Sequence, residues 1–294
     1  MSSAAARWKP LARFIALEER AGLWARSRGP RSAGVYEFVR FGLKQAWACL
    51  FGALLLTLIL GTKLCYPASA PIARYDFLFL AAVGIQLVML RSGLETREEA
   101  KAILLFHVVG TAMELFKTSV GSWEYPEANF FRIAGVPLFS GFMYATVGSY
   151  ISRVWRLFDF QFTRHPSLGA LALLAVGVYA NFFFHHVGPD LRIPLFIITA
   201  LLFGQCSVHH NVWREHRRMP LLLGFFLVAL FIWFAENLAT AGGAWMYPSQ
   251  HHGWQMVPLA KLSSWYLLVI VSYTLVAFVN RPRQYQRGAT STLG

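Results

Sequence analysis

Two glutamates at the ends of apolar runs are the residues of this sequence best placed to do chemistry. Glu114 begins the stretch Glu-Leu-Phe-Lys-Thr-Ser-Val-Gly-Ser-Trp-Glu-Tyr-Pro, which ends at Pro126. Glu236 begins a second copy that ends at Pro248, with Glu, Thr, Gly, Trp, Tyr and Pro in identical register. Ionisable side chains within apolar segments are costly to keep and therefore mark candidate functional sites. Since desolvation favours a neutral carboxylic acid, which can donate a proton, we predict that Glu114 and Glu236 are catalytic acids.

An aromatic pair follows each glutamate: Trp123 and Tyr125 in the first copy, Trp245 and Tyr247 in the second. In an extended Trp-x-Tyr segment both rings point to the same side. We therefore expect these rings to wall a pocket over the acid. The alternative is an aromatic belt at the membrane–water boundary, which needs no ligand.

Other polar side chains are expected near the same end of the helices. The predicted substrate-binding residues besides the aromatic pairs are His107, Asn181, His185, His186, Asp190 and Asn237. A group of His, Glu and Asp side chains could hold a metal ion. However, the sequence contains no H-x-x-x-H and no H-E-x-x-H spacing. We therefore predict neither a metal nor another cofactor.

The composition indicates a membrane protein. The 294 residues are 56% hydrophobic and only 14% charged, whereas a soluble domain has about a quarter charged residues. The net charge of +13 does not predict a nucleic-acid partner, because the basic residues lie in short segments between apolar runs and set the orientation in the bilayer. The three cysteines form no C-x-x-C pair and no even set, so they indicate neither a zinc site nor a disulfide framework.

Eight apolar runs predict an all-α polytopic membrane protein with about eight transmembrane helices. The runs cover residues 45–66, 75–91, 101–118, 131–153, 166–184, 191–209, 219–240 and 258–280. Placing the N-terminus in the cytoplasm puts 21 of the 27 Lys and Arg residues on the inner side. The positive-inside rule therefore predicts that both termini are cytoplasmic and that both motif copies lie at the outer boundary.

The duplicated motif divides the chain into two parallel repeats of four helices, related by an axis along the membrane normal. We predict a cytoplasmic basic leader at 1–44, a first repeat at 45–164, a second at 165–280 and a basic tail at 281–294. The leader is either an amphipathic helix on the membrane surface or a solvated tail. The first two helices of each repeat share no clear identity, so the division is inferred there.

Several of these segments resemble a known family. The stretches from His107 to Glu114, from Gly135 to Tyr144 and from Glu236 to Trp265 resemble the YoaT-type family of uncharacterised bacterial integral membrane proteins, a domain of unknown function. The resemblance covers about residues 35–285. It implies a location in the bacterial cytoplasmic membrane and assigns no activity.

A fainter similarity links the pattern to CruF-type carotenoid hydratases and to heterodimeric-type lycopene cyclases. Those enzymes are thought to protonate an isoprenoid double bond with a buried acid. The similarity implies that Glu114 and Glu236 are the acids and that the aromatic pairs stabilise a carbocation. The Pro-x-Glu-Glu of the cyclases is absent, since this chain reads Pro-Leu-Phe-Ser from Pro137.

Three functions are compatible with these residues. The first is a membrane-embedded acid–base enzyme, similar to a hydratase or cyclase, that acts on an isoprenoid or another lipid. The second is a small proton-coupled transporter, which a polar track between both faces would favour. The third is a structural protein in which the motif joins the repeats. A cavity shared by both acids would favour the enzyme, whereas carboxyls bonded only to backbone amides would favour the structural role. The sequence leaves the oligomeric state open.

Overall fold

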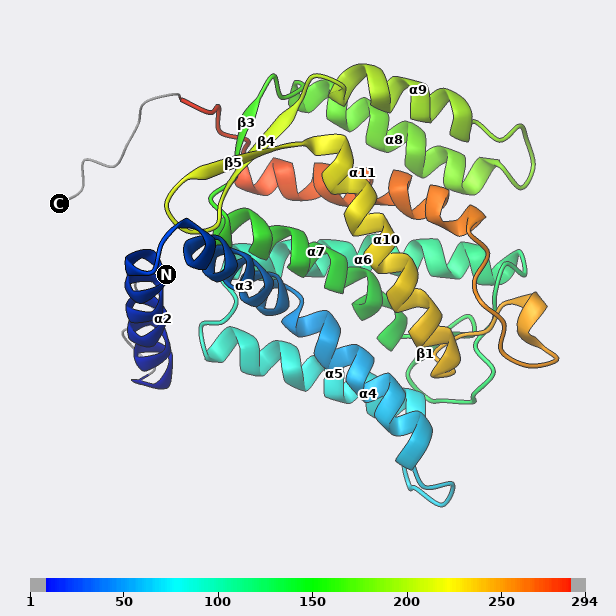
Figure 1. Cartoon of the computed structure of the whole chain (residues 1–294). Helices are drawn as coiled ribbons and strands as arrows, with labels where there is room; N and C mark the ends of the chain where they lie inside the picture. The colour runs from blue at the N-terminus through cyan, green and yellow to red at the C-terminus, as the bar shows by residue number, and fades with distance from the viewer. Residues whose placement is uncertain (1–8, 287–294) are drawn as a thin grey trace.

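The computed structural model describes residues 9–286, and helices make up most of them (Figure 1). The helices are α2 (Lys9–Ser27), α3 (Pro30–Ala48), α4 (Leu50–Cys65), α5 (Arg74–Arg91), α6 (Arg97–Ser119), α7 (Phe139–Leu157), α8 (Leu168–Phe184), α9 (Arg192–Phe203), α10 (Leu221–Ala241) and α11 (Ala260–Asn280). From α4 onward they alternate in direction between two ends of the bundle. We call the end where α6 and α10 finish the motif end, and the opposite end the sheet end.

Short strands lie at both ends of the bundle. At the sheet end, β3 (Gln161–Thr163), β4 (Ser207–Asn211) and β5 (His216–Pro220) form an antiparallel sheet in the order β3-β4-β5. At the motif end, β1 (Arg132–Ile133) and β2 (Val136–Pro137) form a hairpin, and Pro248–Gln250 forms the 3₁₀ turn η1. The sheet therefore closes the end opposite the two motif copies.

Two predicted helical runs are shorter than expected because their ends form strands. The run 191–209 is helical only to Phe203, and residues from Ser207 pair with β3 and β5. The run 131–153 becomes helical only at Phe139. Its first residues turn back through Ala134 and Gly135, both with positive φ, as a two-residue hairpin requires. A continuous apolar run does not distinguish a strand from a helix.

The first predicted run, 45–66, contains a break. Helices α3 and α4 meet at Cys49 and are bent by 65°. Helix α3 starts at Pro30, a favoured residue in the first helical turn, so the expected boundary between residues 44 and 45 falls inside α3. Residues 9–27 of the leader form α2. Residues 1–8 of the leader and 287–294 of the tail lie outside the described residues.

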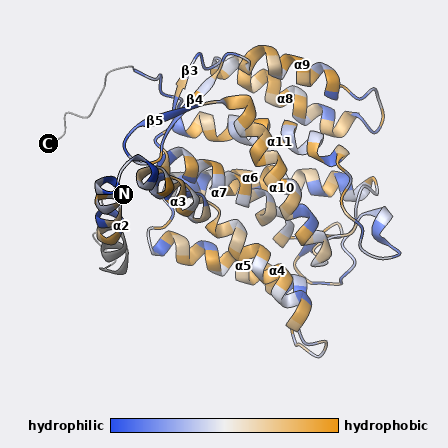
Figure 2. Cartoon of the chain, in the orientation of Figure 1, coloured by the Kyte–Doolittle hydropathy of each residue, from blue (hydrophilic) through white to orange (hydrophobic). Residues whose placement is uncertain are grey.

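The helices indicate a membrane location. Within residues 9–286, three helices are long and apolar enough to cross a membrane, namely Glu99–Ser119 of α6, α10 and α11, and the bent pair α3–α4 qualifies as a broken span. Helices α8 and α9 are apolar but shorter. Apolar residues dominate the helices in Figure 2, whereas polar residues gather on α2 and on β4 and β5. Large apolar side chains such as Leu173, Leu201 and Phe231 are exposed, which suits contact with lipid.

Close packing of α6 against α7 positions one side chain of the site. A Cβ atom added at Gly110 would lie 2.6 Å from the Tyr144 ring, so only glycine leaves room for this ring against α6. Gly110 lies one turn before Glu114, and residues four apart share one face of a helix. The missing side chain therefore directs Tyr144 toward Glu114.

A buried ion pair fixes the other half of α7. An Arg153 Nη2 atom donates to Oε1 of Glu95 over 3.0 Å, and neither side chain is accessible to solvent. Ser149 and Gln86 also donate to the Glu95 carboxylate. Because an unpaired buried charge is strongly destabilising, this pair holds α7 to the segment before α6.

Candidate active site

Both glutamate-bearing helices end in the same glycine cap. After α6, the N–H of Gly121 donates to the Thr118 carbonyl and that of Ser122 to the Lys117 carbonyl. After α10, Gly243 and Ala244 make the equivalent two bonds. Gly121 and Gly243 have φ values of 69° and 67°, which is the left-handed conformation of the Schellman cap. Each cap therefore ends its helix and turns the chain back over the helix end.

The segments after the two caps pair with one another. The N–H of Glu124 donates to the Met246 carbonyl and the N–H of Met246 to the Glu124 carbonyl, both over 2.9 Å. These residues form an isolated antiparallel bridge. They occupy equivalent places in the two motif copies, between the Trp and the Tyr. The bridge therefore brings the two copies together at the motif end.

Glu114 accepts hydrogen bonds from three aromatic side chains. Its Oε2 atom accepts from Trp123 Nε1 over 2.7 Å and from the Tyr125 hydroxyl over 2.6 Å. Its Oε1 atom accepts from the Tyr144 hydroxyl of α7 over 2.8 Å. The Glu114 side chain is buried. As expected for the Trp-x-Tyr segment, both rings point to the same carboxyl.

Glu236 is held in a similar way by the second copy. Its Oε1 atom accepts from the Tyr247 hydroxyl over 2.5 Å, and its Oε2 atom from Trp265 Nε1 of α11 over 2.7 Å. Each acid thus binds the tyrosine of its own motif copy and an aromatic side chain of the following helix. These partners are side chains, so the observed bonds differ from the backbone bonds that a purely structural role would predict.

Aromatic contacts connect the partners of one acid with those of the other. The Trp123 and Tyr247 rings meet edge to face, with centroids 6.0 Å apart. The Tyr144 and Trp265 rings are 6.4 Å apart. Each contact joins a ring that donates to Glu114 with a ring that donates to Glu236. The two acids are therefore parts of one continuous aromatic network.

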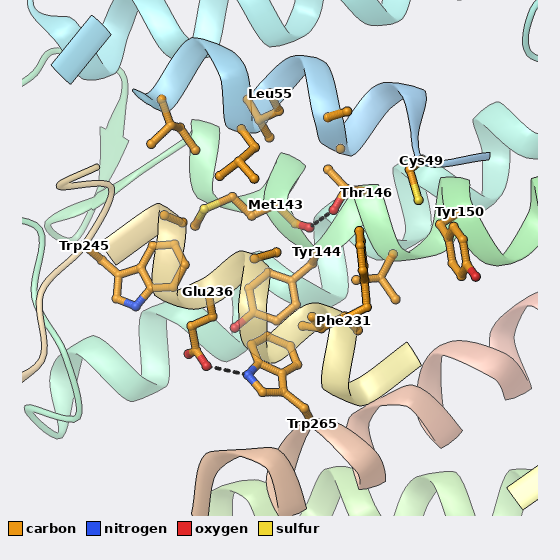
Figure 3. A pocket seen from close by; sticks show the side chains of 18 of the residues that line it. Cys49, Leu55, Met143, Tyr144, Thr146, Tyr150, Phe231, Glu236, Trp245 and Trp265 are labelled. Atoms are coloured by element: carbon orange, nitrogen blue, oxygen red, sulfur yellow. Dashed lines mark hydrogen bonds between the residues drawn. The ribbon is translucent and has the colours of Figure 1, made fainter. Parts of the chain in front are cut away.

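Both acids line the same cavity, which has a volume of about 250 Å³. Its walls come from α4, α7 and α10 and are mostly apolar, including Leu55, Val147 and Ile232. In Figure 3, Trp245, Glu236, Tyr144 and Trp265 gather toward one side, while Cys49 and Tyr150 lie toward the other.

The cavity is elongated along the bundle. Its lining residues on α4 run from Cys49 to Ile59, which corresponds to about 15 Å at a rise of ~1.5 Å per residue. The shape suits a chain-like apolar ligand with one end at the acids.

The surroundings keep the tyrosine donors protonated. Burial and the neighbouring Glu114 carboxyl raise the pKa of Tyr125 well above its usual value, and burial and Glu236 do the same for Tyr247. Both hydroxyls therefore remain donors. The Lys261 ammonium lies 4.5 Å from the Tyr247 ring centroid and 5.2 Å from that of Trp123, distances at which a cation is attracted to an aromatic face.

Four of the predicted binding residues lie together, outside the lining of the cavity. Asn181, His185, His186 and Asp190 occupy the end of α8 and the loop that follows. The Asn181 side chain accepts from the Leu191 N–H over 2.8 Å and therefore fixes this loop. The two histidines contact Lys117 of α6.

His107 and Asn237 also lie outside the lining of the cavity. His107 packs between α6 and α7, with its ring 4.7 Å from that of Phe142. Asn237 accepts from the Val257 N–H over 2.9 Å and so holds the loop before α11. By contrast, Trp123, Trp245 and Tyr247 line the cavity, and Tyr125 reaches it through Glu114.

Three residues at the site were not among the predicted site residues: Tyr144, Trp265 and Lys261. Tyr144 and Trp265 lie in the helix after each motif copy, 30 and 29 residues beyond the glutamate they contact. This similar spacing in the two copies is the sequence signal that could have identified both residues as partners of the acids. Lys261 has no basic counterpart in the first copy, where Ser140 occupies the equivalent position two residues after Leu138. No sequence signal identifies its place over the aromatic rings.

Among the residues that the structure describes, no group of three or more His, Cys, Asp and Glu side chains is arranged to hold a metal ion. The donors around the acids are instead phenol and indole groups. The candidate site thus consists of two acids, aromatic side chains and an apolar cavity.

Taken together, the fold and site define a mostly helical membrane protein with a buried pair of acids at one end. The family model "Protein of unknown function (DUF817)" matches residues 37–273. Over 250 residues the chain is 46% identical to the uncharacterized protein YoaT of Bacillus subtilis (strain 168). The matched region covers 85% of this chain and 94% of YoaT. The chain therefore belongs to the DUF817 family. No solved structure matches it.

Proposed function

We propose that this protein is a membrane-embedded acid–base enzyme that acts on an unsaturated lipid, with Glu114 and Glu236 as its proton-transferring groups. The observation that carries the proposal is that both carboxyls line one elongated, mostly apolar cavity. Such a cavity would hold a hydrocarbon chain, and it exposes few other polar groups to it. A double bond placed at the motif end would lie beside both acids.

The proposed reaction is a proton transfer that leaves the substrate's oxidation state unchanged. One glutamate in its neutral form donates a proton to a carbon of the double bond, and the neighbouring carbon becomes a carbocation. The other glutamate, as a carboxylate, then removes a proton from an adjacent carbon, which gives an isomer or a cyclised product. If water adds to the cation instead, this carboxylate takes the extra proton of the added water, and the product is an alcohol. Proton exchange with solvent restores the pair.

The aromatic walls suit a cationic intermediate. Trp123, Tyr144, Trp245, Tyr247 and Trp265 all line the cavity. The face of an aromatic ring attracts a cation by about 0.5–2 kcal/mol, and it adds no nucleophile that would trap a carbocation. An isoprenoid, which gives a tertiary cation on protonation, is the substrate class that best fits these walls.

The apolar middle of the cavity favours the enzyme over a transporter. Between the acids and Cys49, the lining consists of side chains such as Leu56, Val147, Val228 and Ile232. A proton-coupled transporter needs protonatable or hydrated groups along its path. The cavity lining offers an ion no such path.

The repeat gives the proposed architecture. We propose eight spans in two parallel repeats, with both termini in the cytoplasm and the motif end at the outer face of the bacterial inner membrane. An antiparallel bridge between equivalent residues, such as Glu124 and Met246, is what a two-fold axis would produce. The matching glycine caps and the matching Tyr–Glu bonds support the same axis. The basic residues of β5 at the sheet end agree with a cytoplasmic location for that end.

Deuterium incorporation tests the proposed reaction. The purified protein is reconstituted into vesicles in D₂O with squalene, farnesol or farnesyl phosphate, and the recovered lipid is analysed by mass spectrometry. We expect deuterium on carbon in at least one probe, and none with the Glu114→Gln, Glu236→Gln double variant. Equal labelling by the double variant, or no labelling of any probe, contradicts the proposal. A proton flux into dye-loaded vesicles that requires both glutamates would favour the transporter instead.

A further inference from the structure

A group of cationic side chains lies next to the acids at the motif end. We call Lys117 of α6, Lys261 of α11, Arg192 of α9 and His186 of the α8–α9 loop the lysine cluster. Lys117 lies close enough to Lys261 and Arg192 for their charges to interact, and His186 is close to both lysines. Four separate segments thus bring these groups to one place.

Lys117 is buried among histidine and phenylalanine side chains. Its side chain is only 4% exposed, and its ammonium lies 2.7 Å from Nε2 of His186 and 3.4 Å from Nε2 of His185. Nδ1 of His185 is 3.0 Å from the Asn181 carbonyl, to which it must donate. In that tautomer Nε2 of His185 accepts from the Lys117 ammonium. Lys117 also lies 4.2 Å from the Phe182 ring centroid.

Neither lysine forms an ion pair within residues 9–286. The described ion pairs join no carboxylate to Lys117 or Lys261 within 4.0 Å. Arg192 is paired with Asp190 over 2.6 Å. A buried ammonium without an anion is costly, so the two lysines leave an uncompensated positive charge at this place.

The glutamates compensate this charge only when they are ionised. Lys261 is close enough to Glu236 and Glu114 to interact with their charges. The proposed function, on which this inference rests, needs one of the two acids in its neutral form. When one glutamate is neutral, a single carboxylate remains for two lysine charges. An anion from outside the chain would neutralise the other lysine charge.

We propose that the lysine cluster binds the phosphoryl headgroup of the substrate, which makes the substrate a phosphorylated lipid. A phosphoryl group carries up to two negative charges and several acceptor oxygens, and Lys and Arg are its usual partners in proteins. His186 and Arg192 are partly accessible from the loop side, so the headgroup enters from the surface at the motif end.

The cluster is adjacent to the cavity. Lys261 lies over the Trp123 and Tyr247 rings, and the same two rings line the cavity. A headgroup at the cluster is therefore separated from the cavity only by this aromatic pair. A lipid bound there would place the first carbons of its chain beside Glu114 and Glu236.

Ligand binding distinguishes a lipid headgroup from free phosphate. The full-length protein in a non-ionic detergent is titrated with farnesyl phosphate, farnesol or inorganic phosphate, and the dissociation constants are measured. We expect farnesyl phosphate to bind at least about tenfold more tightly than either farnesol or inorganic phosphate, since the headgroup adds charge-assisted hydrogen bonds. Equal affinity for farnesyl phosphate and farnesol overturns the proposal. Binding of inorganic phosphate as tight as that of farnesyl phosphate also overturns it, because the site then takes free phosphate.

The variants Lys117→Met and Lys261→Met locate the site. Methionine keeps most of the volume and removes the buried charge together with its desolvation cost. We expect each variant to weaken farnesyl phosphate binding by about tenfold or more and to leave farnesol binding unchanged. Lys63→Met, an exposed lysine at the end of α4, is the matched control and should bind farnesyl phosphate normally. Unchanged farnesyl phosphate binding in both cluster variants overturns the assignment.

The glutamate variants separate this inference from the proposed function. Glu114→Gln and Glu236→Gln should keep the binding of farnesyl phosphate while losing deuterium incorporation. If the wild-type protein binds farnesyl phosphate through the lysines but incorporates no deuterium from any probe, the proposed reaction fails and the headgroup site stands. If deuterium enters farnesol as readily as farnesyl phosphate, the headgroup site fails and the reaction stands.

Discussion

Glu124 and Met246 exchange two backbone hydrogen bonds of 2.9 Å, and each occupies the position between the Trp and the Tyr of its motif copy. Because these equivalent residues pair directly, the Trp and Tyr that flank Glu124 in one copy lie near those that flank Met246 in the other. The bridge thus explains how two glutamates far apart in the sequence line one cavity. It also links the fold to the proposed chemistry, since the bridged segments carry the donors Trp123, Tyr125 and Tyr247.

Replacing either acid by glutamine should remove function with little loss of stability. At Glu114, the glutamine oxygen can take the place of Oε2, which accepts from Trp123 and Tyr125, while its NH₂ group donates to the Tyr144 hydroxyl. A tyrosine hydroxyl can turn to accept, whereas an indole N–H cannot. We expect Glu114→Gln to lower the free energy of unfolding by less than about 1 kcal/mol.

Leucine is the contrasting substitution at the same position. Glu114→Leu leaves the Trp123 indole N–H without its acceptor, and an unsatisfied buried donor costs about 1–3 kcal/mol. The free energy of unfolding of both variants is measured by denaturant titration in detergent. Equal stability of the Gln and Leu variants would show that the aromatic donors do not depend on Glu114.

The aromatic contacts between the two copies should couple energetically. The Tyr144 and Trp265 rings are 6.4 Å apart, and each donates to a different acid. A double-mutant cycle with Tyr144→Leu and Trp265→Leu should give a coupling free energy of about 0.5–1.5 kcal/mol. Tyr144→Leu combined with Tyr285→Leu at the sheet end is the control and should be additive. Additivity in the first cycle would contradict a single network.

The glycine cap of α6 should resist substitution. Gly121 has a φ of 69°, so alanine there is strained although nothing lies within 4 Å of its Cβ position. We expect Gly121→Ala to destabilise the protein by about 1 kcal/mol. Gly84→Ala, inside α5 and equally free of neighbours, should instead stabilise it by up to about 1 kcal/mol. The thermal unfolding temperatures of the two variants are compared with that of the wild type. A higher unfolding temperature for Gly121→Ala would contradict the left-handed conformation of Gly121 in the cap.

Acidification should weaken the contact between His186 and Lys117. Burial and the Lys117 charge hold the pKa of His186 below its ordinary value, so the folded state binds this proton less readily than the unfolded chain. As the pH falls below about 6.5, the unfolded state takes up the proton first and the stability decreases. His186→Gln, which keeps an acceptor, should lose less stability between pH 7 and pH 5 than the wild type. A larger loss in the variant would contradict this contact.

The sequence was sufficient to place the two glutamates beside their aromatic pairs, because these residues recur in register and each pair lies close to its glutamate along the chain. It was not sufficient for Tyr144, Trp265 and Lys261, since the period of a helix does not tell which face meets which neighbour. The strand at Ser207–Asn211 was also missed, because Cys206 and Val208 extend the apolar run of α9 and only pairing with β3 and β5 marks this segment as a strand. The break at Cys49 could not be predicted either, because no proline lies near it in the sequence.

Whether both acids serve one site is tested most directly by the deuterium incorporation of the two single variants, Glu114→Gln and Glu236→Gln, compared at equal protein in the same vesicles. If both acids serve one site, each variant alone loses essentially all labelling, and a mixture of the two variants does not recover it. If each variant instead keeps about half of the wild-type labelling, or if either keeps all of it, the acids do not act as one pair and the account is contradicted.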